Sequence, residues 1–214
     1  DGAALDTLWV PPGDAAPVEA AATFRLDEHT PIVYKTQEAT VYVAPLRASD
    51  LMNMTGLQSG ELFAWNVRQT LGKTKVNKAI AESVKDQAEH KNFVLFHNGL
   101  TVLAEDAKLA DGRLTIKGYT VVNGCQSLTT LFENNENISD ELRLLTRVIQ
   151  LSPASDLAAK ITRHSNNQNS ISARDLQSNS TIQRRLQQEF RQEFDNYFGY
   201  GIKRGEVINA QHEI

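Results

Sequence analysis

The residues best suited to chemistry lie in one short segment, Thr120–Ser127, where the run Thr-Val-Val is followed by Asn-Gly-Cys-Gln-Ser. An apolar pattern of helical period, residues 128–132, begins directly after it. A strand that turns into a helix brings together unpaired backbone N–H groups, the positive end of a helix dipole and small polar side chains. Many proteins bind phosphate or another anion in this way. We therefore predict an anion site formed by Asn123, Gly124, Gln126 and Ser127.

Such a site needs cationic side chains from elsewhere, because a helix start stabilises an anion by only about 0.3–1 kcal/mol, or about 2 kcal/mol when partly buried. The candidates are Arg68, Lys73, Arg163 and Arg174. A second Asn-Gly pair, Asn98-Gly99, follows the apolar run 93–96, which we expect to be a strand. The two turns either face each other at the ends of neighbouring strands or are unrelated.

Four successive amide side chains form a second unusual feature, at Asn166, Asn167, Gln168 and Asn169. Amides compete for backbone hydrogen bonds and so favour loops and caps. They also read the edges of bases. Because Arg163 and Arg174 flank the block, we include it among the candidate ligand-binding residues, beside the alternative of a solvated loop.

The single cysteine, Cys125, lies at the predicted helix start. It is either a nucleophile whose pKa the helix end lowers, with His97 as the nearest candidate base, or a small buried hydrophobic residue. One cysteine forms no internal disulfide, and the five histidines show no metal-ligand spacing, so we predict no metal site. A reducing, cytoplasmic location is the expectation.

Composition favours an ordinary globular protein: 214 residues, 41% hydrophobic, 22% charged and a net charge of −4. No apolar run approaches the roughly 20 residues that span a bilayer, so we expect no membrane partner. The net charge hides an asymmetry, since residues 160–204 hold eight basic and four acidic side chains. This basic third suits an anionic partner or a solvated helix face.

The patterning predicts strands at residues 31–34, 40–44, 93–96, 100–103, 113–116, 119–122 and 144–151. It predicts helices within residues 60–89 (broken at Gly72), after residue 127, at 155–164, from 174 and at 181–197. The fold class is therefore α+β, a small mixed sheet followed by a helical C-terminal part. We divide the chain into an N-terminal arm or edge of a missing domain (1–30), a mixed core (31–150) and a helical continuation of that domain (151–214).

Four of these motifs, in this order, resemble the abortive-infection phage-resistance (AIPR) family of bacteria. The resemblance covers roughly residues 60–205, with His97 where the family has asparagine and Ser127 where threonine is common. The matching residues are Leu62-Phe63, Asn66-Val67-Arg68, Leu71-Gly72, Val76-Asn77 and Ile80; Phe96–Thr101; Val121–Ser127; and Asn166–Asn169 with Ile171 and Arg174-Asp175-Leu176. The resemblance implies a role in defence against phage and names no reaction.

The joint at Gly124–Ser127 is also similar to that of ParB-like and sulfiredoxin-like folds, in which a Gly-X-His-Arg turn at a helix start holds a nucleotide phosphate. Here Gln126 and Ser127 replace the His-Arg pair, which removes a cation and a titratable group. This second resemblance therefore implies anion binding. The His-Arg residues that phosphotransfer and sulfinic-acid chemistry would require are absent from this turn.

The sequence leaves three functions open. The first is a nucleotide-binding module, with NTP and Mg²⁺ as the expected ligands and NTPase activity as its enzymatic form. The second is a nucleic-acid-binding module without catalysis, in which Arg184, Arg185 and Arg191 lie along phosphates. The third is a metal-dependent nuclease, although Glu61, Glu82, Asp86 and Asp175 form no local cluster. Further domains of a longer protein, or an oligomer, are additional possible partners.

Overall fold

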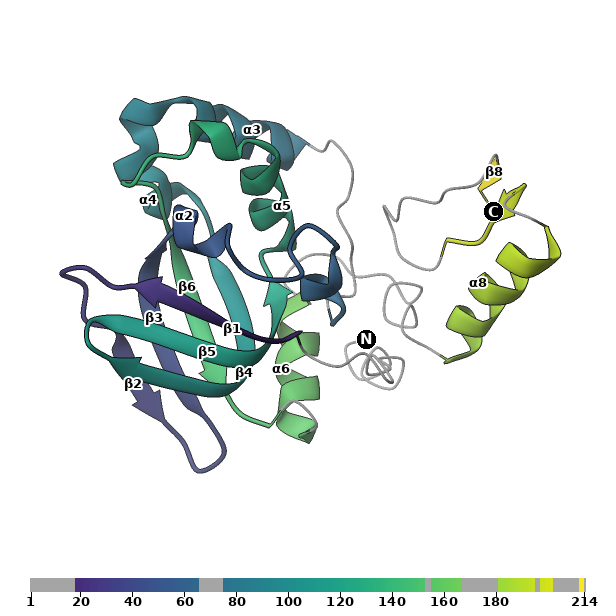
Figure 1. The fold of residues 1–214 in the computed structure, drawn as a ribbon, viewed down its shortest axis with the longest axis horizontal. Coiled ribbons are helices and arrows are strands. Elements are labelled where there is room, and N and C mark those ends of the chain that lie inside the picture. The colour runs from purple at the N-terminus through teal and green to yellow at the C-terminus, as the bar shows by residue number, and fades with distance from the viewer. Residues whose placement is uncertain are drawn as a thin grey trace.

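The computed structural model describes residues 18–65, 75–152, 155–166, 181–194, 197–201 and 212–213. Its centre is a six-stranded sheet of order β1-β5-β4-β6-β3-β2 (Figure 1). The strands are β1 (Val18–Arg25), β2 (Ile32–Lys35), β3 (Thr40–Arg47), β4 (Leu100–Ala110), β5 (Arg113–Asn123) and β6 (Arg143–Gln150). The pair β4–β6 is parallel, and the other four pairs are antiparallel. The chain is therefore α+β with a mixed sheet, as predicted.

Helices cover this sheet from two sides. The α-helices are α2 (Ala48–Leu51), α3 (Lys75–Lys85), α4 (Phe93–Phe96), α5 (Cys125–Glu133), α6 (Asp156–Asn166) and α8 (Thr181–Glu193), with 3-10 turns η1 (Glu61–Phe63), η2 (Gln87–Asn92) and η3 (Asn135–Asn137). Figure 1 shows α3, α4 and α5 grouped at one end of the sheet and α6 beside it. None of the described helices is long and apolar enough to cross a membrane.

Two apolar clusters hold the layers together. The larger one packs side chains of all strands but β2 against α2, α3, α4 and α5, and includes Phe24, Phe93, Tyr119 and Leu128. The smaller one packs Leu103, Val122 and Ile149 of the sheet against Ala158 of α6, with Leu157 and Ile161 at its margin. The larger and the smaller cluster therefore lie on different faces of the sheet, and α6 packs on the face of the smaller one.

Local signals explain several elements. Asp111 and Gly112 both have positive φ, 50° and 68°, which is the backbone of a type I′ turn, and they join β4 to β5 as predicted. The Ser155 hydroxyl accepts a hydrogen bond from the Ala158 amide at 3.2 Å and so caps α6 as predicted. The C-terminal helix is described as Thr181–Glu193, shorter than the predicted 181–197.

The strand predicted at residues 93–96 is wrong, and the structure adds detail in two other segments. Residues 93–96 form the helix α4 and not a strand, because a four-residue apolar run has no diagnostic period and here it directly continues η2. Between residues 60 and 89 the described elements are η1, α3 and the start of η2, while residues 66–74, with the predicted break at Gly72, lie outside the described residues. Residues 18–25, within the predicted arm, form β1 and pair with β5.

The C-terminal elements form a small separate unit, which lies apart from the sheet in Figure 1. It joins α8 to the paired strands β7 (Phe198–Gly199) and β8 (His212–Glu213). Its aromatic rings pack on one another: the ring centroids of Phe190 and Phe194 are 5.2 Å apart, and those of Phe190 and Tyr200 are 5.4 Å apart. The domain division at residues 30 and 150 stays a prediction.

Candidate anion-binding site

The predicted anion site is the start of α5, and its geometry begins with Gly124. This glycine is the N-cap residue with φ 95° and ψ 12°, a left-handed conformation that L side chains rarely adopt. The first bond of the helix runs from the Leu128 amide to the Gly124 carbonyl at 3.0 Å. Because the N-cap residue is glycine, it has no side chain that could cap the helix. The first N–H groups of a helix have no acceptor within the helix itself.

Gln126 and Ser127 lie in this first turn and are half-buried. Neither side chain hydrogen-bonds to another residue in the part of the chain that the structure describes. Both are small polar groups at the positive end of a nine-residue helix. They are thus available to a ligand.

The two Asn-Gly turns lie side by side, one of the two arrangements that the sequence left open. β4 begins at Leu100 and β5 ends at Asn123, and Thr101 pairs directly with Asn123. A Cβ atom placed on Gly124 would lie 2.9 Å from the Gly99 carbonyl oxygen. A Cβ on Gly99, whose φ is 77°, would overlap the Leu145 carbonyl oxygen on β6. Glycine is therefore required at both turns for close backbone packing.

Asn123 ties this joint to α6. Its side-chain amide donates a hydrogen bond to the Ser165 carbonyl at 3.0 Å. Ser165 lies in the last turn of α6, which also carries Arg163 and ends at Asn166. The structure thus brings Asn123 next to the end of the helix that precedes the amide-rich block, and leaves the Asn123 side-chain oxygen for other contacts.

Sequence reasoning missed one cation, Arg147 on β6. Arg147 and Asn123 flank Thr101 on the two neighbouring strands, so all three share one row across the sheet. The Arg147 guanidinium donates to the Thr101 hydroxyl at 3.0 Å and is otherwise exposed. A single charged residue in the middle of the apolar run 144–151 was the available signal, since a strand in that context places it on an accessible face.

Of the other candidate ligand-binding residues, the structure describes some, and the rest lie outside the described residues. Asn98 is exposed beside Gly99, and Arg163 is half-buried on α6. Asn166 ends α6, although its side chain is outside the description. Arg68, Lys73, Asn167, Gln168, Asn169 and Arg174 lie outside the described residues, so their place at the site stays a prediction.

Cys125 and His97 are the candidate nucleophile and base. Cys125 is buried and His97 is half-buried. Cys125 is 5% exposed and belongs to the larger apolar cluster, which favours a packing role for its thiol. The His97 ring packs on Phe93 with centroids 3.9 Å apart. Burial lowers the pKa of His97, because desolvation disfavours the imidazolium. Burial therefore favours the neutral form of the His97 imidazole.

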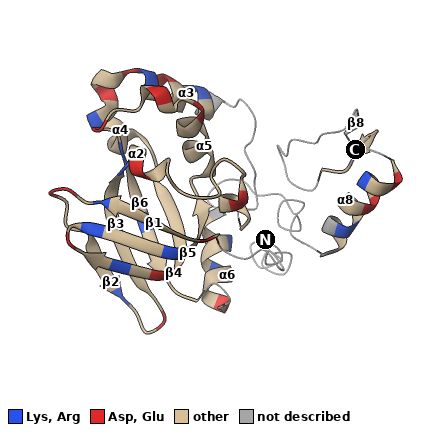
Figure 2. Cartoon of the chain, viewed as in Figure 1, with Lys and Arg blue, Asp and Glu red and all other residues tan. Residues whose placement is uncertain are grey.

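Charges around the sheet are mixed in sign. Figure 2 shows Lys and Arg interspersed with Asp and Glu over the strands and α3. Across the described ranges, no three His, Cys, Asp or Glu side chains gather so that they could hold a metal ion. On α8, Arg185 is bound to Glu189 at 2.7 Å, Arg191 is exposed, and the Arg184 side chain is outside the description.

Comparison with known proteins adds the family. Residues 63–213, more than half of the chain, match the family described as AIPR protein. No curated protein and no solved structure is similar enough to match. The matched range holds both Asn-Gly turns, the start of α5, Arg147 and α6. This chain therefore belongs to the AIPR family, and that membership indicates a role in abortive infection, the bacterial defence against phage.

Proposed function

We propose that this chain is a nucleotide- or nucleic-acid-binding module of phage defence that holds a phosphate group at the start of α5. One observation carries the proposal. The start of α5, the adjoining turn at Gly99 and the cation Arg147 lie at the same end of the sheet, where Asn123, Thr101 and Arg147 form one row across three strands. Donors and positive charge gathered at a backbone turn are what a phosphate requires.

The energies explain why both parts are needed. The helix start contributes about 0.3–1 kcal/mol toward an anion. A hydrogen bond to a charged group contributes about 1.5–3 kcal/mol. A millimolar Kd corresponds to about 4 kcal/mol, so neither part alone reaches even that affinity. Gln126 and Ser127 supply the further donors that orient the phosphate oxygens.

The proposal is one of binding. NTP with Mg²⁺ is the first ligand class to test, because a helix start that holds one phosphate suits a free nucleotide as well as a nucleic-acid chain. Hydrolysis of an NTP or of nucleic acid would be an additional property of this same site. The proposal assigns no role in such hydrolysis to the Cys125 thiol.

The first experiment is calorimetric titration of the protein with each NTP in the presence of Mg²⁺, repeated on Arg147→Gln and Gln126→Ala. Arg113→Gln is the matched control, because Arg113 is also exposed on the sheet but lies at the opposite end of β5. Substitution of Gly124 is unsuitable, since a side chain there would overlap Leu100 and damage the fold itself.

We expect saturable binding that Arg147→Gln weakens about tenfold or more, in line with loss of about 1.4 kcal/mol or more. The control should bind as the parent does. If both site variants bind every nucleotide and a short oligonucleotide as tightly as the parent, the phosphate site is not at the start of α5.

A further inference from the structure

Among the described residues, α6 covers only part of its side of the sheet. Side chains of Leu157, Ala158 and Ile161 lie over Leu103, Val122 and Ile149. The remainder of this side, over β6, β3 and β2, we call the open face. Its residues are Ile32, Tyr34, Val43, Leu145 and Arg147.

Strand register shows that these residues share one side. Directly paired residues project from the same face of a sheet. Arg147 pairs with Thr101 on β4 and with Val43 on β3, and Val43 pairs with Ile32 on β2. One row therefore runs from Asn123 through Thr101, Arg147 and Val43 to Ile32. The next row, two residues further along each strand, runs from Leu103 through Ile149 and Val41 to Tyr34.

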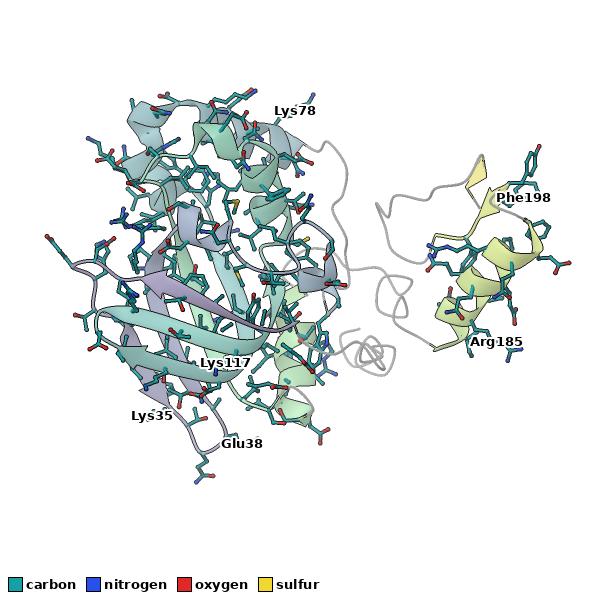
Figure 3. The ribbon with its side chains drawn as sticks, viewed as in Figure 1. Lys35, Glu38, Lys78, Lys117, Arg185 and Phe198 are labelled. Carbon is teal, nitrogen blue, oxygen red and sulfur yellow. The ribbon has the colours of Figure 1, made fainter. Side chains whose placement is uncertain are left out.

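The open face is apolar and exposed. Ile32 is 72% exposed, Tyr34 65% and Leu145 44%. Single exposed apolar residues are ordinary, but a contiguous group of them on one sheet face marks a binding surface. Lys35 and Glu38 lie at the free end of the β2–β3 hairpin in Figure 3, outside this group.

Three arginines lie on this same side of the sheet. Arg147 stands in the middle of the long row. Arg47 and Arg143 pair with each other at the end of β3 and β6, and both bind Asp27, at 2.7 and 2.8 Å. Three guanidinium groups thus border an apolar strip that includes an exposed tyrosine, and Asp27 and Asp140 are the carboxylates bound to them.

This combination fits one kind of ligand. Unpaired bases present flat apolar faces that stack on aromatic side chains, and their backbone carries one phosphate per residue for Arg to bind. A duplex hides its base faces inside the stack. The phosphate site that we propose at the start of α5 lies at the other end of the long row.

The length of the row sets the size of the ligand. Strands lie about 4.8 Å apart, so four steps from Asn123 on β5 to Ile32 on β2 span about 19 Å. That distance suits a segment of several nucleotides, near the lower end of the roughly 4–16 nucleotides that single-strand-binding folds cover. One nucleotide at the start of α5 would leave Ile32 and Tyr34 unoccupied.

We propose that the open face is the base-binding platform for single-stranded nucleic acid whose phosphate is held at the start of α5. Tyr34 stacks with a base, Ile32 and Leu145 lie under neighbouring bases, and Arg147 binds the phosphate at the start of α5. The inference rests on the proposed function and names its ligand class.

The test is fluorescence anisotropy with labelled oligothymidine of 4, 8 and 12 nucleotides and with oligouridine of the same lengths, beside calorimetry with NTPs. The platform variants are Tyr34→Ala and Ile32→Ala. Tyr34→Phe keeps the ring, and Val33→Ala is the matched control, because Val33 is exposed on the same strand but projects from the other face. Circular dichroism confirms that each variant is folded.

We expect affinity to rise with length, and Tyr34→Ala to lower oligonucleotide affinity roughly 5- to 150-fold, the range of one stacked base at about 1–3 kcal/mol. Tyr34→Phe and Val33→Ala should bind as the parent does. NTP affinity should be insensitive to Tyr34→Ala and sensitive to Arg147→Gln. The thymidine and uridine series show whether DNA or RNA is preferred.

Two results would overturn the inference. If oligonucleotides bind no better than NTPs and Tyr34→Ala changes nothing while Arg147→Gln weakens NTP binding, the platform is wrong and the phosphate site stands. If no oligonucleotide binds and sedimentation shows self-association that Tyr34→Ala abolishes, the open face is a protein interface. Failure of the phosphate site itself would give a different result: Arg147→Gln and Gln126→Ala would leave the affinity for every ligand unchanged.

Discussion

Single residues at the two Asn-Gly turns set how closely three strands approach. Gly99 and Gly124 carry positive φ, and each also faces neighbouring atoms that leave no room for a Cβ. Gly112 carries a similar φ of 68° but has open space around it. The comparison separates the cost of a left-handed backbone from the cost of steric overlap.

We predict that Gly112→Ala lowers the free energy of unfolding by about 1–2 kcal/mol, the cost of a left-handed conformation for an L residue. Gly99→Ala should cost about 1–3 kcal/mol more, because the overlap is with a backbone carbonyl that no rotamer change relieves. Urea denaturation of both variants measures the difference. Equal costs would show that the Gly99 turn relaxes freely.

His97 predicts a pH dependence of stability. Its pKa is lowered by burial, so between the folded and the unfolded values the unfolded chain binds the extra proton. The free energy of unfolding should therefore fall as pH drops below about 6.5, the ordinary histidine value. His97→Asn keeps a polar side chain that does not titrate. We expect the Tm of the variant to fall less between pH 7.5 and 5.5 than that of the parent, and identical losses would contradict the prediction.

Among the elements, α6 is joined to the site by a side-chain hydrogen bond from Asn123. Asn123 donates to the Ser165 carbonyl in the last turn of α6, where helix carbonyls lack partners within the helix. The bond therefore holds the end of α6 against the row that contains Thr101 and Arg147. The amide-rich block begins at this same end.

Asn123→Ala should lower the free energy of unfolding by about 0.5–1.5 kcal/mol, the net value of one hydrogen bond. It should also speed amide hydrogen exchange in residues 162–166 relative to the start of α6. Asn134→Ala is the control, since Asn134 makes a similar bond to the Thr130 carbonyl within its own helix. Unchanged exchange at the end of α6 would mean that other contacts hold it.

Prediction from sequence worked where the local signal was specific. The Asp111-Gly112 turn, the Ser155 cap and the strand–helix joint at Gly124 each depend on residues with few conformational alternatives. Phe93–Phe96 was predicted wrongly, because four apolar residues have no period and the choice depended on the preceding turn, η2. Arg147 was missed because its nearness to Asn123 comes from the β4–β6 pairing, which brings together residues far apart in sequence.

At the scale of the whole molecule, one carboxylate joins three segments. Asp27, between β1 and β2, binds Arg47 of β3 and Arg143 of β6. Hydrogen bonds from Arg47, and then from Arg143, hold the pKa of Asp27 below its ordinary value despite partial burial. A carboxyl group with a lowered folded pKa stabilises the protein above its unfolded pKa, and this contribution is lost as pH falls through the folded value.

Asp27→Asn should therefore flatten the loss of stability below about pH 4, the ordinary aspartate value. Asparagine tolerates the positive φ of 50° at this position, so the backbone is preserved. Asp111→Asn is the matched control: Asp111 has the same φ and no ion pair among the residues that the structure describes. Chemical denaturation from pH 7 to pH 3 measures both. Parallel curves for Asp27→Asn and the parent would show that the network does not contribute.

The pairing of β1 with β5 has a consequence for biosynthesis. Val18 lies opposite Tyr119, so β1 leaves the ribosome about a hundred residues before its partner. At roughly 5–20 residues per second, that interval is about 5–20 s. During it the nascent β1 has no strand to join, and the sheet closes at this edge only when the β4–β5 hairpin has been translated. Codons that slow or speed the ribosome between these two strands should therefore change how much of the protein reaches its folded form.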